Sequence, residues 1–75
     1  MLNVTLYSKP ECHLCEQAEL DLKKLEETIP FKLTIVDIET DAAIKESFEL
    51  EIPVVEAGPF RLKAPFSRQE LKMTL

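Results

Sequence analysis

A strand, an amphipathic helix and a second strand open the chain, and no other feature constrains its fold as strongly. Residues 2–7 (LNVTLY) and residues 31–36 (FKLTIV) are rich in β-formers, which is typical of strands. Between them, apolar side chains recur every three or four residues from Cys15 to Ile29. This spacing predicts a helix of about four turns that begins near Cys12 and ends at Pro30. Two strands joined by such a helix pair in parallel through a right-handed crossover.

The second half of the chain predicts a short helix, a hairpin and a closing helix. Thr40 and Asp41 are suited to cap the short helix, whose first turn is acidic. Residues 52–56 (IPVVE) and 60–63 (FRLK) are expected to form two strands joined by a turn. Ser67 is expected to cap the last helix.

The predicted order of elements is therefore β-α-β-α-β-β-α, which is an α/β arrangement. A mixed four-stranded sheet flanked by helices accommodates both the parallel pair and the hairpin. With seventy-five residues, no internal repeat and no linker, the chain is expected to form a single small domain over residues 1–75.

Charge and hydropathy narrow the range of partners. Nine basic and fourteen acidic residues give a net charge of −5, so the chain lacks the basic surface that nucleic acid requires. No segment approaches the roughly 20 apolar residues that cross a bilayer, and residues 1–7 lack the features of a secretory signal. We therefore expect a cytoplasmic protein, a monomer, with no nucleic-acid or membrane partner.

Both cysteines of the chain and its only histidine lie in the segment SKPECHLCEQ, residues 8–17. Three interpretations are open for this cluster: a redox dithiol, part of a metal site, or a pair of inert buried thiols. In a reducing cytoplasm a permanent structural disulfide is not expected, and a close cysteine pair is more often catalytic or metal-binding.

The predicted start of the helix favours the redox interpretation. Cys12 and Cys15 share one helix face, so they can meet and form a disulfide. At a helix N-terminus the free amides and the dipole favour a thiolate, most of all at the outer residue Cys12, and Lys9 and a protonated His13 add to this effect. Cys12 is therefore the expected nucleophile in thiol–disulfide exchange, and Cys15 is expected to resolve the mixed disulfide.

The other two interpretations stay open at this point. A metal ion needs about four ligands, whereas the segment offers only Cys12, His13 and Cys15. A zinc or iron–sulfur site would therefore require a partner chain, and we expect no metal ligands in the single chain. Inert cysteines remain an alternative because free cysteine packs well in cores.

Two segments resemble the glutaredoxin-like proteins of the thioredoxin superfamily. VTLYSKPECHLCEQA (residues 4–18) is similar to their active-site segment, and EIPVVEAG (residues 51–58) is similar to their proline-bearing strand. The element order agrees along the whole chain. The resemblance implies a thioredoxin-like fold and a dithiol oxidoreductase in which Cys12 is the nucleophile and Cys15 the resolving residue.

The resemblance also implies roles for residues near the cysteines. Pro53 matches the cis-proline that packs beside the dithiol, and Ile52 before it offers backbone groups to a strand-like substrate. Lys9 matches a basic residue that helps to hold a glutathione carboxylate in glutaredoxins. His13 and Leu14, the latter an expected exposed apolar contact, complete the set of candidate substrate-binding residues.

Two departures from typical glutaredoxins argue against tight glutathione binding. The segment LKAPFSRQEL (residues 62–71) lacks the glycine pair and the acidic pair that hold the far end of glutathione, and Glu51 replaces the usual threonine. We therefore expect no tightly bound cofactor, with glutathione left as one possible reductant. Two related groups fit better: the redoxins that serve ribonucleotide reductase, and small glutaredoxin-like proteins with a C-x-L-C site. The His-Leu pair favours the second.

The expected function is thus a thiol–disulfide oxidoreductase, or electron carrier, whose partners are protein disulfides and a reductase. That reductase is expected to be thioredoxin reductase or the glutathione system. Two other functions fit the same residues: a redox-sensing or binding module without turnover, and a metal or iron–sulfur carrier that works as a dimer.

Overall fold

The computed structural model describes residues 2–64 and 66–74, and a mixed sheet of four strands lies at its centre. The strands are β1 (Leu2–Ser8), β2 (Phe31–Asp37), β3 (Val54–Ala57) and β4 (Phe60–Lys63), in the spatial order β2-β1-β3-β4. β1 pairs with β2 in parallel, whereas β3 is antiparallel to both β1 and β4. The prediction of a parallel pair followed by a hairpin is confirmed.

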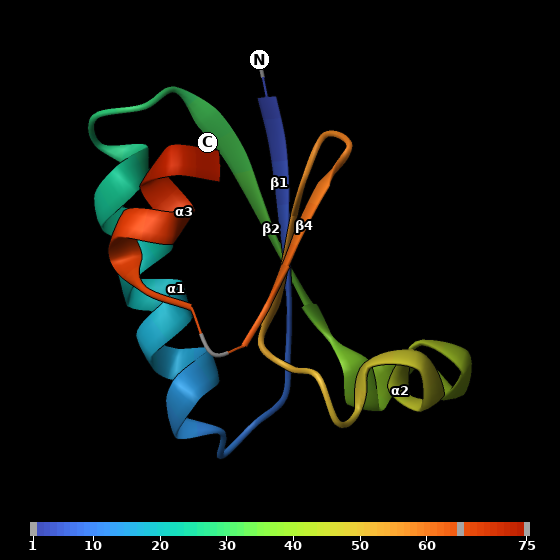
Figure 1. Cartoon of the computed structure of the whole chain (residues 1–75). Helices are drawn as coiled ribbons and strands as arrows, with labels where there is room; N and C mark the ends of the chain where they lie inside the picture. The colour runs from blue at the N-terminus through green and yellow to red at the C-terminus, as the bar shows by residue number, and fades with distance from the viewer. Residues whose placement is uncertain (1, 65, 75) are drawn as a thin grey trace.

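The helices are α1 (His13–Glu26), the 3₁₀ helix η1 (Ile38–Thr40), α2 (Ala42–Phe48) and α3 (Arg68–Thr74). In Figure 1, α1 and α3 lie side by side on one face of the sheet, and α2 lies on the other side. The predicted order β-α-β-α-β-β-α is confirmed, with η1 as an addition. No helix in the described part of the chain is long and apolar enough to span a membrane.

Local capping decides where the helices begin and end. The Asp41 carboxylate accepts the amides of Ala43 and Ile44 at 2.9 and 3.2 Å, so the predicted cap of α2 is Asp41 itself. Ser67 Oγ accepts the Glu70 amide at 3.1 Å, which confirms the cap predicted for α3. α1 ends earlier than Pro30, because the amides of the residues after Glu26 turn back onto the last carbonyls of the helix.

The main hydrophobic core lies between the sheet and the pair α1 and α3. Side chains alternate along a strand, so Val4 and Leu6 of β1 share this face with their partners Ala57 and Val55 of β3. The buried members of the core are Val4, Leu6, Ala18, Leu22, Leu25, Phe31, Val55, Ala57 and Leu71. This packing holds α1 against β1, so the start of α1 has a defined place at the end of that strand.

The opposite face of the sheet is more polar. The same alternation directs Tyr7 of β1, Glu56 of β3 and its β4 partner Arg61 toward the side of α2. α2 has no fully buried residue, and its contact with the sheet includes the stacking of Phe48 on Tyr7.

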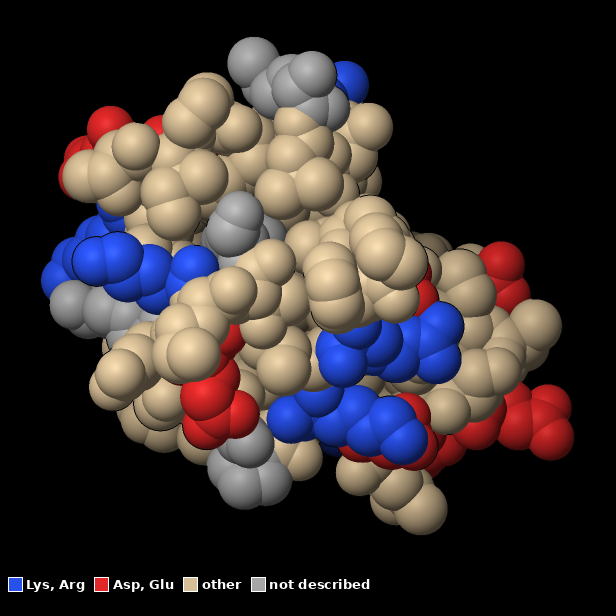
Figure 2. Space-filling view, turned by 45° about the horizontal axis from the view of Figure 1, so that its top comes forward, with Lys and Arg blue, Asp and Glu red and all other residues tan. Residues whose placement is uncertain are grey.

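Charges of both signs are mixed on the molecular surface. In Figure 2, blue and red side chains lie against one another on the same face rather than in separate patches. The ion pairs among the described residues are Lys23–Glu19, Lys45–Glu39, Arg61–Glu56 and Lys63–Glu51. Because they are largely solvent-exposed, each contributes only about 0–1 kcal/mol to stability.

Candidate active site

Cys12 is the N-cap residue of α1. Its backbone is extended, its carbonyl oxygen accepts the Glu16 amide at 3.0 Å, and its Sγ accepts the Cys15 amide at 3.3 Å. The sulfur thus occupies the place that a Ser, Thr or Asp oxygen usually takes at a helix start. The amide and the positive end of the helix dipole both stabilise negative charge on Sγ, and Cys12 is partly exposed.

The turn that leads into Cys12 depends on Glu11, whose φ is 60°. This left-handed conformation is uncommon for a residue other than glycine, and it costs on the order of 1–3 kcal/mol. Sequence reasoning missed it because no glycine or asparagine marks the position. The turn redirects the chain from β1 into α1, so that Cys12 becomes the capping residue.

Cys15 lies in the first turn of α1 and is buried, with 2% of its surface exposed. Burial raises the pKa of Cys15 from 9.0 to about 12, and the neighbouring Cys12 sulfur adds to the rise. A backbone hydrogen bond from Lys9 and the charge of its side chain both lower the pKa of Cys15, but their effect is smaller than that of burial. Near neutral pH Cys15 is therefore a protonated thiol behind the partly exposed Cys12.

Three of the candidate binding residues flank the cysteines. Lys9, in the loop after β1, is exposed and places its backbone against Cys15. His13 and Leu14 are the first two residues of α1, and both are exposed, Leu14 to 58%. The structure puts all three next to the dithiol, while their contact with a substrate stays a prediction.

The peptide bond between Ile52 and Pro53 is cis, as the resemblance implied. Pro53 is buried, and its carbonyl oxygen accepts the Ala64 amide at 3.1 Å. Pro53 and Leu14 line one small hollow of about 70 Å³ between α1 and the segment after β4. The fold therefore brings the proline segment, about forty residues along the chain, beside the first turn of α1.

Ile52 does not belong to β3, contrary to the prediction. Its amide donates to the Phe48 carbonyl oxygen at 3.1 Å, so the strand begins at Val54. Among the described residues no hydrogen bond reaches the Ile52 carbonyl oxygen. The predicted pairing of Ile52 with a substrate strand therefore rests on its carbonyl group, because its amide is already engaged.

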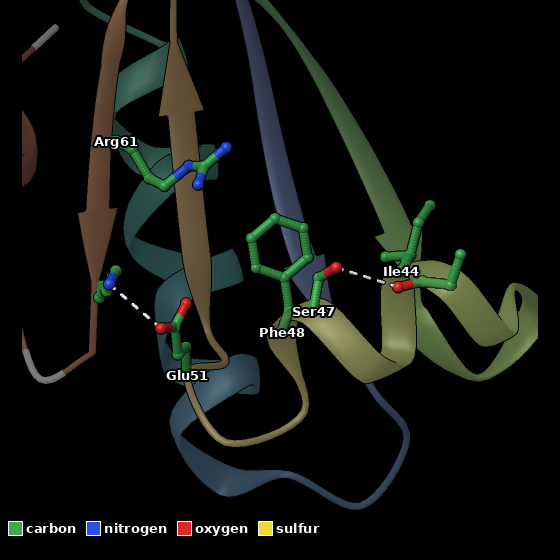
Figure 3. A pocket seen from close by; sticks show the side chains of 7 residues that line it. Ile44, Ser47, Phe48, Glu51 and Arg61 are labelled. Atoms are coloured by element: carbon green, nitrogen blue, oxygen red, sulfur yellow. Dashed lines mark hydrogen bonds and ion pairs between the residues drawn. The ribbon is translucent and has the colours of Figure 1, made fainter.

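A second hollow, of about 490 Å³, opens on the side of α2. Figure 3 shows its wall, where Phe48 at the end of α2 faces Arg61 of β4, and Glu51 lies below them. Glu51 pairs with Lys63 at 3.1 Å. Sequence reasoning missed this group, because its members come from α2, the loop after it and the distant strand β4. The alternation of Arg61 and Lys63 on one face of β4 was its only local signal.

The described part of the chain contains no group of three or more His, Cys, Asp or Glu side chains arranged to hold a metal ion. Cys12 and Cys15 are free thiols in this structure. The expectation of no resident cofactor stays a prediction.

A family model for the glutaredoxin-like domain (DUF836) matches residues 3–75. The chain belongs to this glutaredoxin-like family. Among solved structures, protein XcR50 from X. campestris is 32% identical, with 95% of this chain and 92% of that chain covered and a TM-score of 0.78. Protein Ne2328 from Nitrosomonas europaea is 21% identical, with 99% and 91% covered and a TM-score of 0.79.

Mitochondrial thioredoxin 3 from Saccharomyces cerevisiae shares the fold of this glutaredoxin-like chain. It is 17% identical, with 97% of this chain and 74% of the thioredoxin covered and a TM-score of 0.77. The thioredoxin-like fold is thereby confirmed. A comparison with curated protein sequences gives no significant match. A glutaredoxin-like domain with two nearby cysteines at the start of α1 indicates a redox function.

Proposed function

We propose that this glutaredoxin-like protein is a dithiol–disulfide oxidoreductase that acts on protein disulfides. The difference between its two cysteines carries the proposal. Cys12 is partly exposed and its Sγ accepts an amide at the start of α1, whereas Cys15 is buried and burial raises its pKa to about 12. The first sulfur is suited to attack a disulfide, and the second is suited to stay a thiol until a mixed disulfide has formed.

The reaction has two exchange steps. The Cys12 thiolate attacks one sulfur of the substrate disulfide, a mixed disulfide forms, and the other substrate sulfur leaves as a thiolate that takes up a proton. Cys15 then loses its proton and attacks the Cys12 sulfur, which releases the second substrate thiol. Two electrons pass from the dithiol to the substrate, and the protein is left with a Cys12–Cys15 disulfide that an external reductase must reduce.

The surroundings of the dithiol favour protein substrates over glutathione. Leu14 is 58% exposed beside the cysteines, and the lining of the hollow between Leu14 and Pro53 is mainly apolar, with Ala18 and Phe66 beside the polar Gln17 and Asp21. Apolar surface of this kind is suited to the side chains around a protein cysteine. The glycine and acidic pairs that hold glutathione in typical glutaredoxins are absent from residues 62–71.

Reduction of a protein disulfide such as insulin by dithiothreitol tests the proposal. We expect the wild-type protein to accelerate the reaction and Cys12→Ser to abolish the acceleration. Cys15→Ser should instead form a stable mixed disulfide with the substrate, which mass spectrometry detects. Leu20→Ala, on the exposed side of α1, is the matched control and should behave as wild type. Equal rates in wild type and Cys12→Ser would refute the proposal.

The reductase is identified by coupling the same assay to NADPH. We expect turnover with thioredoxin reductase and little with glutathione and glutathione reductase, since the glutathione contacts are missing. Turnover that depends on glutathione alone would contradict the assignment of the reductase. A dithiol that is oxidised and reduced reversibly, yet turns over with neither reductase, would favour a redox sensor.

A further inference from the structure

The backbone of Phe48 fixes the position of Ile52. Phe48 is the last residue of α2, and its carbonyl oxygen accepts the amides of Glu51 at 2.8 Å and Ile52 at 3.1 Å. A displacement of Phe48 therefore moves Ile52 with it. Ile52 is partly buried, and among the described residues no hydrogen bond reaches its carbonyl oxygen.

The ring of Phe48 contacts two side chains of the sheet. It stacks on Tyr7, with ring centroids 4.6 Å apart and planes inclined by 25°, and the Arg61 guanidinium carbon lies 5.2 Å from its centroid. Figure 3 shows the ring projecting from the end of α2 toward Arg61. Stacked rings contribute about 0.5–1.5 kcal/mol beyond their burial. A cation over a ring contributes about 0.5–2 kcal/mol.

One carboxylate joins the two side chains that hold the ring. The Tyr7 hydroxyl donates to Glu56 Oε1 at 2.9 Å, and Arg61 Nε donates to Glu56 Oε2 at 2.9 Å. Tyr7, Phe48, Glu56 and Arg61 therefore form a closed group, called here the Phe48 cluster. Of the three strands that carry it, β1 leads toward the cysteines and β3 follows the proline segment.

Buried Pro53, bonded to the Ala64 amide, holds Ile52 from its C-terminal side. On its N-terminal side, the other side-chain restraints are weak. α2 is only seven residues long and has no fully buried residue. The Glu51–Lys63 pair is half-exposed on both sides, so it contributes at most about 1 kcal/mol. The Phe48 ring is thus the main side-chain anchor between the end of α2 and the sheet.

We propose that Phe48 is a positioning residue of the oxidoreductase, which holds the Ile52 carbonyl group where a substrate strand can pair with it. The inference rests on the proposed function, because it concerns the binding of the extended segment around a substrate cysteine. A substrate amide donates to the Ile52 carbonyl oxygen and aligns the substrate disulfide with Cys12. The ring acts through the backbone of Ile52 and touches neither substrate nor sulfur.

Phe48→Ala tests the role, with Phe60→Ala as a matched control on the exposed end of β4. We expect Phe48→Ala to raise KM for a protein disulfide about tenfold, with kcat within about twofold, because the misplaced Ile52 carbonyl group weakens binding of the ground state and the transition state alike. Alkylation of Cys12 by iodoacetamide should stay within about twofold of wild type, since this reagent needs no strand pairing. Phe48→Tyr should restore KM, and Phe60→Ala should leave it unchanged.

Hydrogen exchange measures how firmly Ile52 is held and does not depend on oxidoreductase activity. The amides of Glu51 and Ile52 should exchange about tenfold faster in Phe48→Ala, while the Val4 amide in the central strand keeps its rate. If Phe48→Ala does not fold, Phe48→Leu, which keeps an apolar side chain and loses both ring contacts, is judged by the same criteria.

An unchanged KM, unchanged exchange at Ile52, or a fall in the rate of Cys12 alkylation as large as the fall in kcat/KM would each overturn the inference. A wild-type protein without oxidoreductase activity would refute the proposed function instead. The exchange rates would then decide alone whether Phe48 positions Ile52.

Discussion

The reactivity of Cys15 in a variant without Cys12 measures how far the fold raises the pKa of the Cys15 thiol. Cys12→Ser leaves Cys15 as the only thiol and keeps it buried, and burial is the largest cause of the rise in the pKa of Cys15 from 9.0 to about 12. The Cys12 sulfur supplies part of that rise, so about 12 is the upper limit of the pKa in the variant. At this limit the thiolate fraction at pH 8 is about a thousandfold below that of an ordinary cysteine. The higher nucleophilicity of a more basic thiolate offsets roughly twentyfold of this factor. We therefore expect alkylation about fiftyfold slower than for a free cysteine, before burial slows it further.

The assay is iodoacetamide labelling of Cys12→Ser followed by mass spectrometry across a pH series. The labelling rate should rise about tenfold per pH unit through pH 10, because the thiolate fraction does so below the pKa. The same variant unfolded in urea supplies the rate of an ordinary cysteine, and Cys15→Ser supplies the rate of Cys12. A folded rate within about fivefold of the unfolded rate at pH 8, or a plateau near pH 9, would refute the reasoning about burial.

The same shift predicts how stability depends on pH. The folded protein holds the Cys15 proton more tightly than the unfolded chain does, so this contribution to stability is complete below about pH 9. It is lost as the pH rises toward about 12. Between about pH 9 and about pH 12 the melting temperature of Cys15→Ala should therefore fall less than that of the wild type. Parallel curves for the two proteins would contradict this prediction.

Two further predictions concern the two faces of the sheet: the packing of α1 on one face and the pKa of Tyr7 on the other. Leu22→Ala, in the buried face of α1, should reduce the free energy of unfolding by about 2–5 kcal/mol in urea denaturation. Leu20→Ala on the exposed face of the same helix should change it by less than about 0.5 kcal/mol, and equal effects would contradict the assigned orientation of α1. On the other face, burial and the hydrogen bond to Glu56 raise the pKa of Tyr7 above 10.0, so Glu56→Gln should lower it part of the way back. Absorbance titration of the tyrosine measures the change, and an unmoved Tyr7 pKa would show that Glu56 does not act on it.

Local sequence signals determined much of the fold and the placing of the dithiol. The apolar spacing of α1 and the β-rich segments around it predicted the parallel pair, because each pattern depends only on near neighbours in the chain. The same spacing put Cys15 on the inner side of the helix and left Cys12 at its start, where free amides stabilise a thiolate. Asp41 and Ser67 were recognisable as caps for the same reason.

The tertiary structure alone decided how the second half of the site is held. The Ile52 amide bonds to Phe48 rather than continuing β3, and the Phe48 ring contacts both Tyr7 and Arg61, which lie far apart in the chain. No local pattern encodes such contacts, because they depend on which faces the folded strands and helices turn toward one another. The depth at which Cys15 is buried has the same origin, since desolvation of its sulfur requires the whole core to be assembled around α1.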